Sequence, residues 1–136
     1  MTNIVDGTPE SHRDLLTAPL TATLTTIDGN GRPQSTAVWF LLDGDGRLKS
    51  SITSDRQKYT NLTGNPECDL FIIDPQNPFR TLEIRARAEL EPDPEQDEVR
   101  RFAEAYGVDP AMLVNESEDR YTVTYRPRRI VANPAT

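Results

Sequence analysis

Residues 82–90 read Leu-Glu-Ile-Arg-Ala-Arg-Ala-Glu-Leu, so apolar and charged side chains alternate along the whole stretch. Successive side chains of a β-strand point to opposite faces of a sheet. The alternation therefore predicts a strand with one face in the core and one charged face. The rest of the sheet has to come from similar stretches on either side of this one.

Three strands are predicted upstream, separated by two turn sequences. Residues 20–27 alternate apolar side chains with threonines, which favour strands. The runs 33–42 and 47–53 are also β-prone. Asp28-Gly29-Asn30-Gly31 and Asp43-Gly44-Asp45-Gly46 supply the turn residues between the three runs. These strands are therefore predicted to form a meander.

Two further strands complete the predicted sheet. Residues 68–73 form an apolar run typical of a strand covered on both faces, and residues 121–131 form the last strand. Six strands with short helices between them predict a small antiparallel β-barrel, which leaves no free sheet edge. The expected fold is mostly β (α+β), in a single domain over residues 1–136.

Helices are predicted where a capping residue or a proline precedes apolar residues at helical spacing. The strongest case is Asp93-Pro94, followed by Val99, Phe102, Ala103 and Tyr106 at positions i, i+3, i+4 and i+7. The expected helices cover residues 8–18, 54–64 and 94–106, with a shorter one opening at Asp109-Pro110.

The composition excludes several classes of protein. With 15 Lys and Arg against 22 Asp and Glu, the net charge is -7, which argues against a general nucleic-acid binder. One cysteine, Cys68, cannot form an internal disulfide, and one histidine, His12, cannot supply a His-rich metal site. Neither residue has the partner of a nucleophilic site. No metal is expected.

The chain is polar for a folded protein, with 35% hydrophobic residues. A small domain buries only about two-thirds of its unfolded surface, and pairing buries more, so a homodimer is expected. No apolar run approaches the roughly 20 residues of a membrane helix, and the N-terminus lacks a signal pattern. The expected location is the cytoplasm, without a membrane partner.

Residues 53–62 carry the best candidate for a binding site. Arg56 and Lys58, with hydroxyls from Thr53 and Ser54, stand where a strand ends and a helix begins. Cations, hydroxyls and free N–H groups at a helix start suit a phosphate. The alternative is that both cations lie on a solvated helix face.

Aromatic residues offer a second set of candidates. Trp39, the only tryptophan, and Phe40 point to opposite sides of a strand, so one of them is available to a ligand or partner. The alternative is that both fill the core and a dimer seam. Phe79 follows a Pro-rich loop and has the shape to cover a planar ring, although such residues often only anchor a loop.

An ordered set of short motifs resembles the pyridoxamine 5'-phosphate oxidase-like split-barrel family, and within it the branch that uses the deazaflavin coenzyme F420. The resemblance is strongest over residues 20–73 and extends more loosely to about 131. The motifs are Gly31-Arg32-Pro33-Gln34, Val38-Trp39-Phe40, Asp43-Gly44, Ile52-Thr53, Arg56-x-Lys58-x-x-Asn61-Leu62, Asn65-Pro66 and the strand 68–73.

The resemblance implies a homodimer of six-stranded split barrels with two cofactor sites at the subunit interface. Lys58 and Arg56 are implied to hold the cofactor phosphate, and Thr53 and Asn61 to support it. The strand at Val38 and Trp39 is implied to lie along the ring system. Phe79 is implied to reach the ring from the partner subunit.

The resemblance also implies a reaction. Arg56-Gln57-Lys58 replaces the adjacent Ser-Arg-Lys of flavin users, which favours F420 over FMN. The implied activity is transfer of a hydride from the reduced cofactor to an electron-poor C=C, C=N or C=O bond of a small organic substrate. No catalytic side chain is needed, because the cofactor carries the hydride.

Three alternatives stay open from the sequence. They are an FMN-dependent oxidoreductase of the same fold, a non-catalytic protein that binds a flavin, deazaflavin or tetrapyrrole, and a dimerisation protein without a cofactor. An anionic cofactor tail in this acidic chain needs a locally basic groove. Candidates are Arg32, Lys49, Arg126, Arg128 and Arg129, with plain solvated charges as the alternative.

Overall fold

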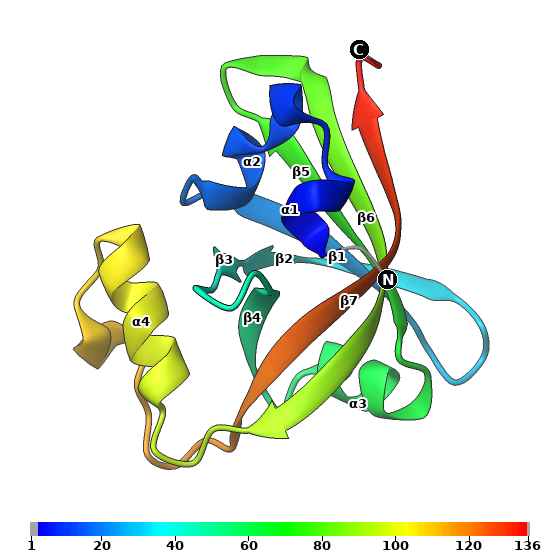
Figure 1. Ribbon diagram of the computed structural model, residues 1–136. Coiled ribbons are helices and arrows are strands. Elements are labelled where there is room, and N and C mark those ends of the chain that lie inside the picture. Colours follow the sequence, from blue (N-terminus) through cyan, green and yellow to red (C-terminus); the bar gives the residue numbers. More distant parts are fainter. Residues whose placement is uncertain (1–2, 136) are drawn as a thin grey trace.

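The computed structural model describes residues 3–135, in which seven antiparallel strands form one strongly curled sheet (Figure 1). The strands are β1 (Thr21–Ile27), β2 (Pro33–Trp39), β3 (Leu41–Leu42), β4 (Leu48–Thr53), β5 (Glu67–Asp74), β6 (Asn77–Pro92) and β7 (Arg120–Asn133). Their order across the sheet is β2-β1-β5-β6-β7-β4-β3. The predicted mostly β split barrel is confirmed.

The two edge strands, β2 and β3, are consecutive in the chain and are separated only by Phe40. The expected strand 33–42 is therefore divided, since β2 pairs with β1 and β3 pairs with β4. Phe40 leaves the ladder because both its N–H and its carbonyl bond to the hydroxyl of Tyr106, at 3.1 and 2.9 Å. The seventh strand thus arises from a break in the second of the six expected strands.

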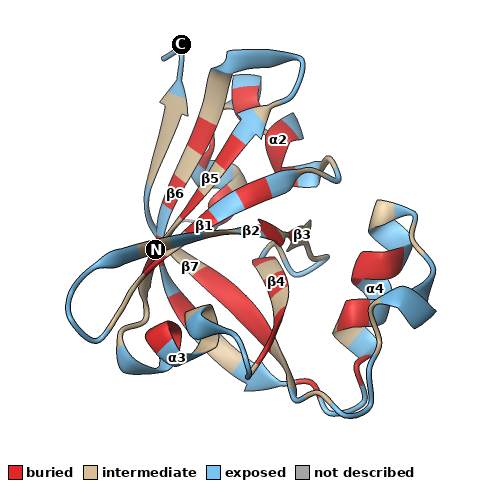
Figure 2. Ribbon diagram, turned by 180° about the vertical axis from the view of Figure 1, so that it is seen from behind, coloured by how far each residue is buried: buried red, intermediate tan, exposed pale blue. Residues whose placement is uncertain are grey.

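Strand β6 is the longest element and pairs with both β5 and β7. Its central part shows the predicted alternation, with Leu82, Ile84, Ala86 and Ala88 buried. Figure 2 shows the same alternation of buried residues on neighbouring strands, whose apolar side chains meet inside the curl of the sheet. The hydrophobic core lies there.

The expected helix over residues 8–18 is wrong. The chain instead forms three short pieces, α1 (Ile4–Gly7), η1 (Glu10–His12) and α2 (Asp14–Thr17). The hydroxyl of Thr8 donates to the carbonyl of Ile4 at 2.6 Å, so Thr8 closes α1 and does not cap a following helix. Ile4, Leu15 and Leu16 belong to the buried core, which holds these short turns in place.

Helix α3 (Gln57–Gly64) begins later than predicted, because Asp55 accepts a hydrogen bond from the Thr53 hydroxyl and does not cap the helix. Helix α4 (Asp97–Tyr106) also begins later. Asp93 still caps it, and its carboxylate accepts from the backbone N–H groups of Asp97 and Glu98 at 3.1 and 3.2 Å.

The expected helix at Asp109-Pro110 is only the 3-10 turn η2 (Pro110–Met112). Helix α4 and η2 stand beside the barrel and are joined to it by the connections from β6 and to β7 (Figure 1). None of the helices within residues 3–135 has the length and apolar character that crossing a membrane requires.

Candidate functional site

Two adjoining cavities lie between β2, β4, the start of α3 and the segment 111–118. The larger one, about 720 Å³, is lined mainly by polar residues and is called the basic cavity for its lining cations Arg56, Lys58 and Arg120. The smaller one, about 260 Å³, is called the apolar cavity. Its apolar walls are Val38, Trp39, Val99, Phe102 and Leu113. Both cavities share lining residues, so they form one continuous site.

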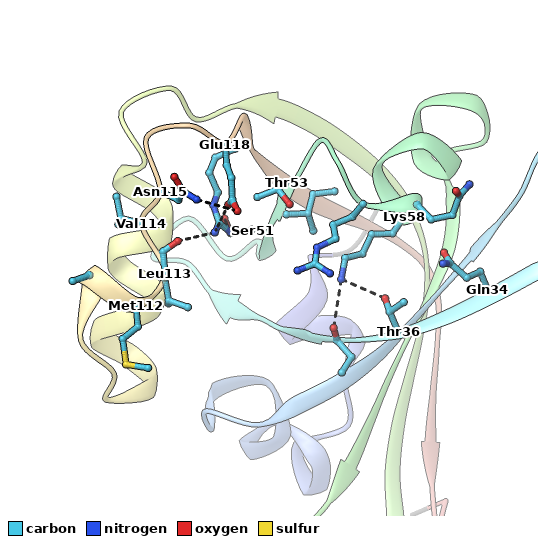
Figure 3. Close-up of a pocket in the computed structure, with 16 residues that line it drawn as sticks. Gln34, Thr36, Ser51, Thr53, Lys58, Met112, Leu113, Val114, Asn115 and Glu118 are labelled. Atoms are coloured by element: carbon cyan, nitrogen blue, oxygen red, sulfur yellow. Dashed lines mark hydrogen bonds and ion pairs between the residues drawn. The ribbon is translucent and has the colours of Figure 1, made fainter.

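Lys58 lies in the first turn of α3 and points across to β2. Its Nζ is 3.4 Å from the hydroxyl of Thr36 and 3.5 Å from the carbonyl of Ala37, as the dashed lines of Figure 3 mark. Partial burial, and then the nearby charge of Arg56, lower the pKa of Lys58. Within residues 3–135 no carboxylate forms an ion pair with either cation, which leaves both available to an external anion.

The turn between β4 and α3 places these cations. Strand β4 ends at Thr53, which lines the basic cavity, and the N–H of Arg56 donates to its carbonyl at 3.2 Å. The Thr53 hydroxyl donates to Asp55 and thereby lowers the pKa of that carboxyl. The turn is thus closed by its own polar groups, and Arg56 and Lys58 are both left at the cavity wall.

Asn61 lies behind the wall of the basic cavity. Its side chain is 3% exposed and donates to Thr26 and Gln34 at 3.0 and 3.1 Å, while it accepts from Gln57 at 2.8 Å. Gln34 and Gln57 line the basic cavity, and Asn61 does not. Asn61 therefore holds two wall residues in position.

Two other predicted site residues do not line the cavities of the single chain. Ser54 is half-buried, and its N–H donates to the carbonyl of Asp119 at 3.0 Å. Phe79 is 84% exposed and lies near the start of β6. The β5–β6 turn is at the end of the barrel opposite α3 (Figure 1). Contact between Phe79 and this cavity requires a second subunit.

The adjacent aromatic residues Trp39, at the end of β2, and Phe40, just after it, lie in different surroundings. Phe40 is 1% exposed and fills the core, whereas Trp39 and Val38 line the apolar cavity. Trp39 stacks on Tyr106, with ring centroids 4.2 Å apart and planes 8° from parallel. The Tyr106 hydroxyl also contacts the carbonyl of Leu20 at 2.6 Å, which ties α4 to the barrel beside the cavity.

Arg120 is a cavity residue that sequence reasoning missed. It opens β7 directly opposite Thr53 and lines both cavities. Its Nη2 lies 2.8 Å from the carbonyl of Leu113 and 3.4 Å from the carboxylate of Glu118, and its Nη1 lies 3.4 Å from the hydroxyl of Ser51. No local motif marks Arg120, because only strand pairing brings it to the β4–α3 turn.

The segment 111–118 forms the wall that faces Lys58 across the basic cavity. Figure 3 shows Met112, Leu113, Val114, Asn115 and Glu118 on one side, with Lys58, Thr36 and Gln34 on the other. This wall was also absent from the predicted site, since its residues carry no recognisable motif.

The proposed tail-binding cations lie elsewhere. Neither cavity is lined by any of Arg32, Lys49, Arg126, Arg128 and Arg129. Lys49 pairs with Asp43 at 2.6 Å, and Arg126 and Arg128 pair with Glu89 and Glu67 at 3.0 and 2.9 Å. In the single chain they do not form a basic groove beside the site.

A curled antiparallel sheet with a cation-lined cavity at the start of α3 defines the class of protein, which is a split β-barrel. The sequence profile of the pyridoxamine 5'-phosphate oxidase family matches residues 8–131. The chain belongs to this family.

Solved structures agree with this assignment. A protein named F420 reductase is 34% identical, with a TM-score of 0.83, over 91% of this chain and 98% of that chain. A conserved hypothetical protein from Mycobacterium tuberculosis is 24% identical, with a TM-score of 0.73, over 97% and 87%. The haem storage protein HutZ from Vibrio cholerae is 18% identical, with a TM-score of 0.70, over 90% and 92%. The last two share the fold. A comparison with proteins of curated function found no match.

Proposed function

We propose that this protein is an F420-dependent oxidoreductase that transfers a hydride to an electron-poor C=C, C=N or C=O bond of a small organic substrate. The observation that carries the proposal is the cation pair Arg56 and Lys58, which faces a cavity of about 720 Å³ without a carboxylate partner among the described residues. Cofactor pockets are typically about 300–1,000 Å³, so the space suits such a group.

The residues present fit a phosphate-bearing cofactor with a flat ring. Arg56 and Lys58 would bind the phosphate. The Thr53 hydroxyl donates to Asp55 and so holds the turn that presents both cations. Val38 and Trp39 offer an apolar wall for the ring. When bound, the deazaflavin supplies the hydride. The chain's own task is to bind and orient the ligands and to keep water away from the reacting atoms.

Two observations favour F420 over FMN. One is the spacing Arg56-Gln57-Lys58, and the other is the 34% identity to the protein named F420 reductase over 91% of this chain. FMN dependence and cofactor binding without turnover are the alternatives that the experiment below separates.

We further propose that the working unit is a cytoplasmic homodimer with cofactor sites at the subunit interface. Phe79 and Ile73, on neighbouring strands near the β5–β6 turn, are 84% and 43% exposed. Exposed large apolar side chains of this kind are typical of surfaces that a partner covers. A second copy that supplies Phe79 completes a site that a single chain leaves open.

The proposal is tested by titrating the purified protein with F420 and FMN in parallel and following the fluorescence of each cofactor. Saturable F420 binding that Lys58→Ala weakens strongly is the expected result. Lys49→Ala is the matched control, because Lys49 is the chain's other lysine and is ion-paired outside the cavities.

Other outcomes redirect the proposal. Preference for FMN assigns the protein to the flavin users of the same fold, and binding of neither cofactor contradicts the proposed function. Reduced F420 is then mixed with quinones, enones and tetrapyrroles. Tight binding without oxidation by any of them favours a carrier over an enzyme.

A further inference from the structure

Arg120 differs from the paired arginines Arg80 and Arg101 in how its charge is compensated. Arg101 reaches Asp43 and Glu98 at 2.7 and 3.1 Å, and Arg80 is paired with both Asp14 and Asp74. Arg120 has one carboxylate contact, a long one at 3.4 Å. These arginines serve the structure through full ion pairs, whereas Arg120 does not.

The hydrogen bonds of Arg120 are also incomplete. A guanidinium has five N–H donors, and here only the contact with the Leu113 carbonyl, at 2.8 Å, is short. The contacts with Ser51 and Glu118 are both 3.4 Å. The Nε atom is shielded from solvent and has no partner within residues 3–135.

The surroundings make this incomplete pairing costly. The side chain of Arg120 is only 13% exposed, so water compensates its charge poorly. Burial also lowers the pKa of Arg120. A bound anion would accept hydrogen bonds from the unused N–H donors of this cation and balance its charge, which lowers the cost of burying it.

The position of Arg120 narrows the chemistry of that anion. Arg120 lines both cavities, so it lies where the basic cavity meets the apolar one. The apolar walls there include Trp39, Phe102 and Leu113. The ligand that satisfies both surroundings has a flat apolar body and one acidic group at its edge.

We infer that the apolar cavity and Arg120 together form a binding site for a small carboxylate with a flat apolar body. A planar guanidinium recognises a carboxylate through paired hydrogen bonds, which a lysine cannot reproduce. That this carboxylate is the hydride acceptor rests on the proposed function, because the acceptor has to lie within about 3–3.5 Å of the cofactor ring in the same cavity.

The site is tested without cofactor, with cinnamate and its neutral amide, cinnamamide, as matched probes. Binding is measured by calorimetry and by the fluorescence of Trp39, the only tryptophan of the chain. The intact protein is expected to bind cinnamate about 10-fold or more tightly than cinnamamide, since a charged hydrogen-bonded pair favours the carboxylate.

Variants connect that preference to Arg120. Arg120→Gln is expected to remove the preference, and Arg120→Lys, which keeps the charge but loses the planar fork, to restore it in part. Glu118→Gln, which removes the competing carboxylate, is expected to strengthen cinnamate binding. Circular dichroism shows whether each variant folds. If Arg120→Gln is unfolded, Arg120→Lys becomes the variant that tests the inference.

Equal binding of the two probes, binding of neither, or a preference that survives in Arg120→Gln overturns the inference. A preference lost in Lys58→Ala and kept in Arg120→Gln also overturns it. Failure here is distinct from failure of the proposed function. A protein that binds F420 but shows no carboxylate preference refutes only this site, and one that prefers cinnamate but binds no cofactor refutes only the proposed function.

Discussion

The cations at the start of α3 and the acids on the outer face of β5 and β6 are charged groups of opposite sign, and both line cavities. At the start of α3, the cations Arg56, Lys58 and Arg120 line one cavity. On the face of β5 and β6 that points away from the core, Asp69 and Glu83 both line a separate cavity of about 490 Å³. Burial, and then the neighbouring Glu83, raise the pKa of Asp69 to about 7.

The two groups differ in whether their own residues can reduce the uncompensated charge. Asp69 and Glu83 are able to share a proton, and Arg85 lies 3.2 Å from Glu83. Arg56 cannot adjust in this way, because arginine does not lose its proton. The described residues also offer neither Arg56 nor Lys58 a carboxylate partner. The acidic group can therefore adjust its protonation, whereas the Arg56 charge stays uncompensated by any described carboxylate.

The largest effect that tests this contrast is expected for Lys58→Met. The variant should bind the deazaflavin about 10- to 150-fold more weakly, which corresponds to the about 1.5–3 kcal/mol of a hydrogen bond to a charged group. Stability without cofactor should not fall, because Lys58 reaches only neutral oxygens at 3.4 and 3.5 Å. Fluorescence titration and thermal unfolding measure the two quantities. A less stable variant with intact affinity would make Lys58 a structural residue.

Asp69→Asn tests the acidic group. The folded protein holds the Asp69 proton up to a pKa of about 7, while the unfolded chain releases it near 3.8. The contribution of Asp69 to the free energy of unfolding is therefore complete below about pH 4, and it is lost as the pH rises to 7. Because Asp69 is partly exposed and Glu83 opposes the effect, the loss is on the order of 1–2 kcal/mol.

Asparagine cannot ionise, so Asp69→Asn should lose less stability than the parent between pH 5 and 8 in urea unfolding. Glu91→Gln, at an exposed position of the neighbouring strand β6, is the matched control. An Asp69→Asn protein with the parent's pH dependence would show that Asp69 does not hold the proton.

Arg101→Gln provides the reference for a fully paired charge. Hydrogen bonds from Arg101 and Lys49 hold the pKa of Asp43 well below its ordinary value. The Arg101 side chain is 44% exposed, so water screens the pair and the variant should lose less than about 1 kcal/mol at neutral pH. This stabilisation is present above pH 3.8 and is lost as the pH falls through the lower folded pKa. The free energy of unfolding of Arg101→Gln is measured against pH in low and in high salt. If its pH-dependent change is as large as the one that Asp69 causes, paired and unpaired groups do not differ in their effect on stability.

The strands of this fold can be predicted from local sequence because their signal repeats every two residues. The alternation of residues 82–90 predicts the centre of β6, and Asp43-Gly44-Asp45-Gly46 predicts the turn before β4. The break at Phe40 cannot be predicted in this way. It depends on Tyr106, which lies 66 residues further along the chain.

The same division holds for the site. Arg56, Lys58 and Thr53 are recognisable because one short segment carries them all. Arg120 joins them only through the register of β4 and β7, which pairs it with Thr53. Local sequence therefore predicts the turn that carries the cations, and long-range strand pairing decides which other residues face it.

The smallest effect on the single chain is expected for Phe79→Ala, and it tests whether the basic cavity is complete in one subunit. Phe79 is 84% exposed, so its removal should change the free energy of unfolding by less than about 0.5 kcal/mol. Cofactor affinity should nevertheless fall several-fold, because the partner's ring no longer covers the cofactor. Sedimentation at matched concentrations separates loss of the contact from loss of the dimer. Unchanged affinity in a protein that remains dimeric would place the whole site within one chain, and Arg56, Lys58 and Arg120 would then bind the ligand without help from a second copy.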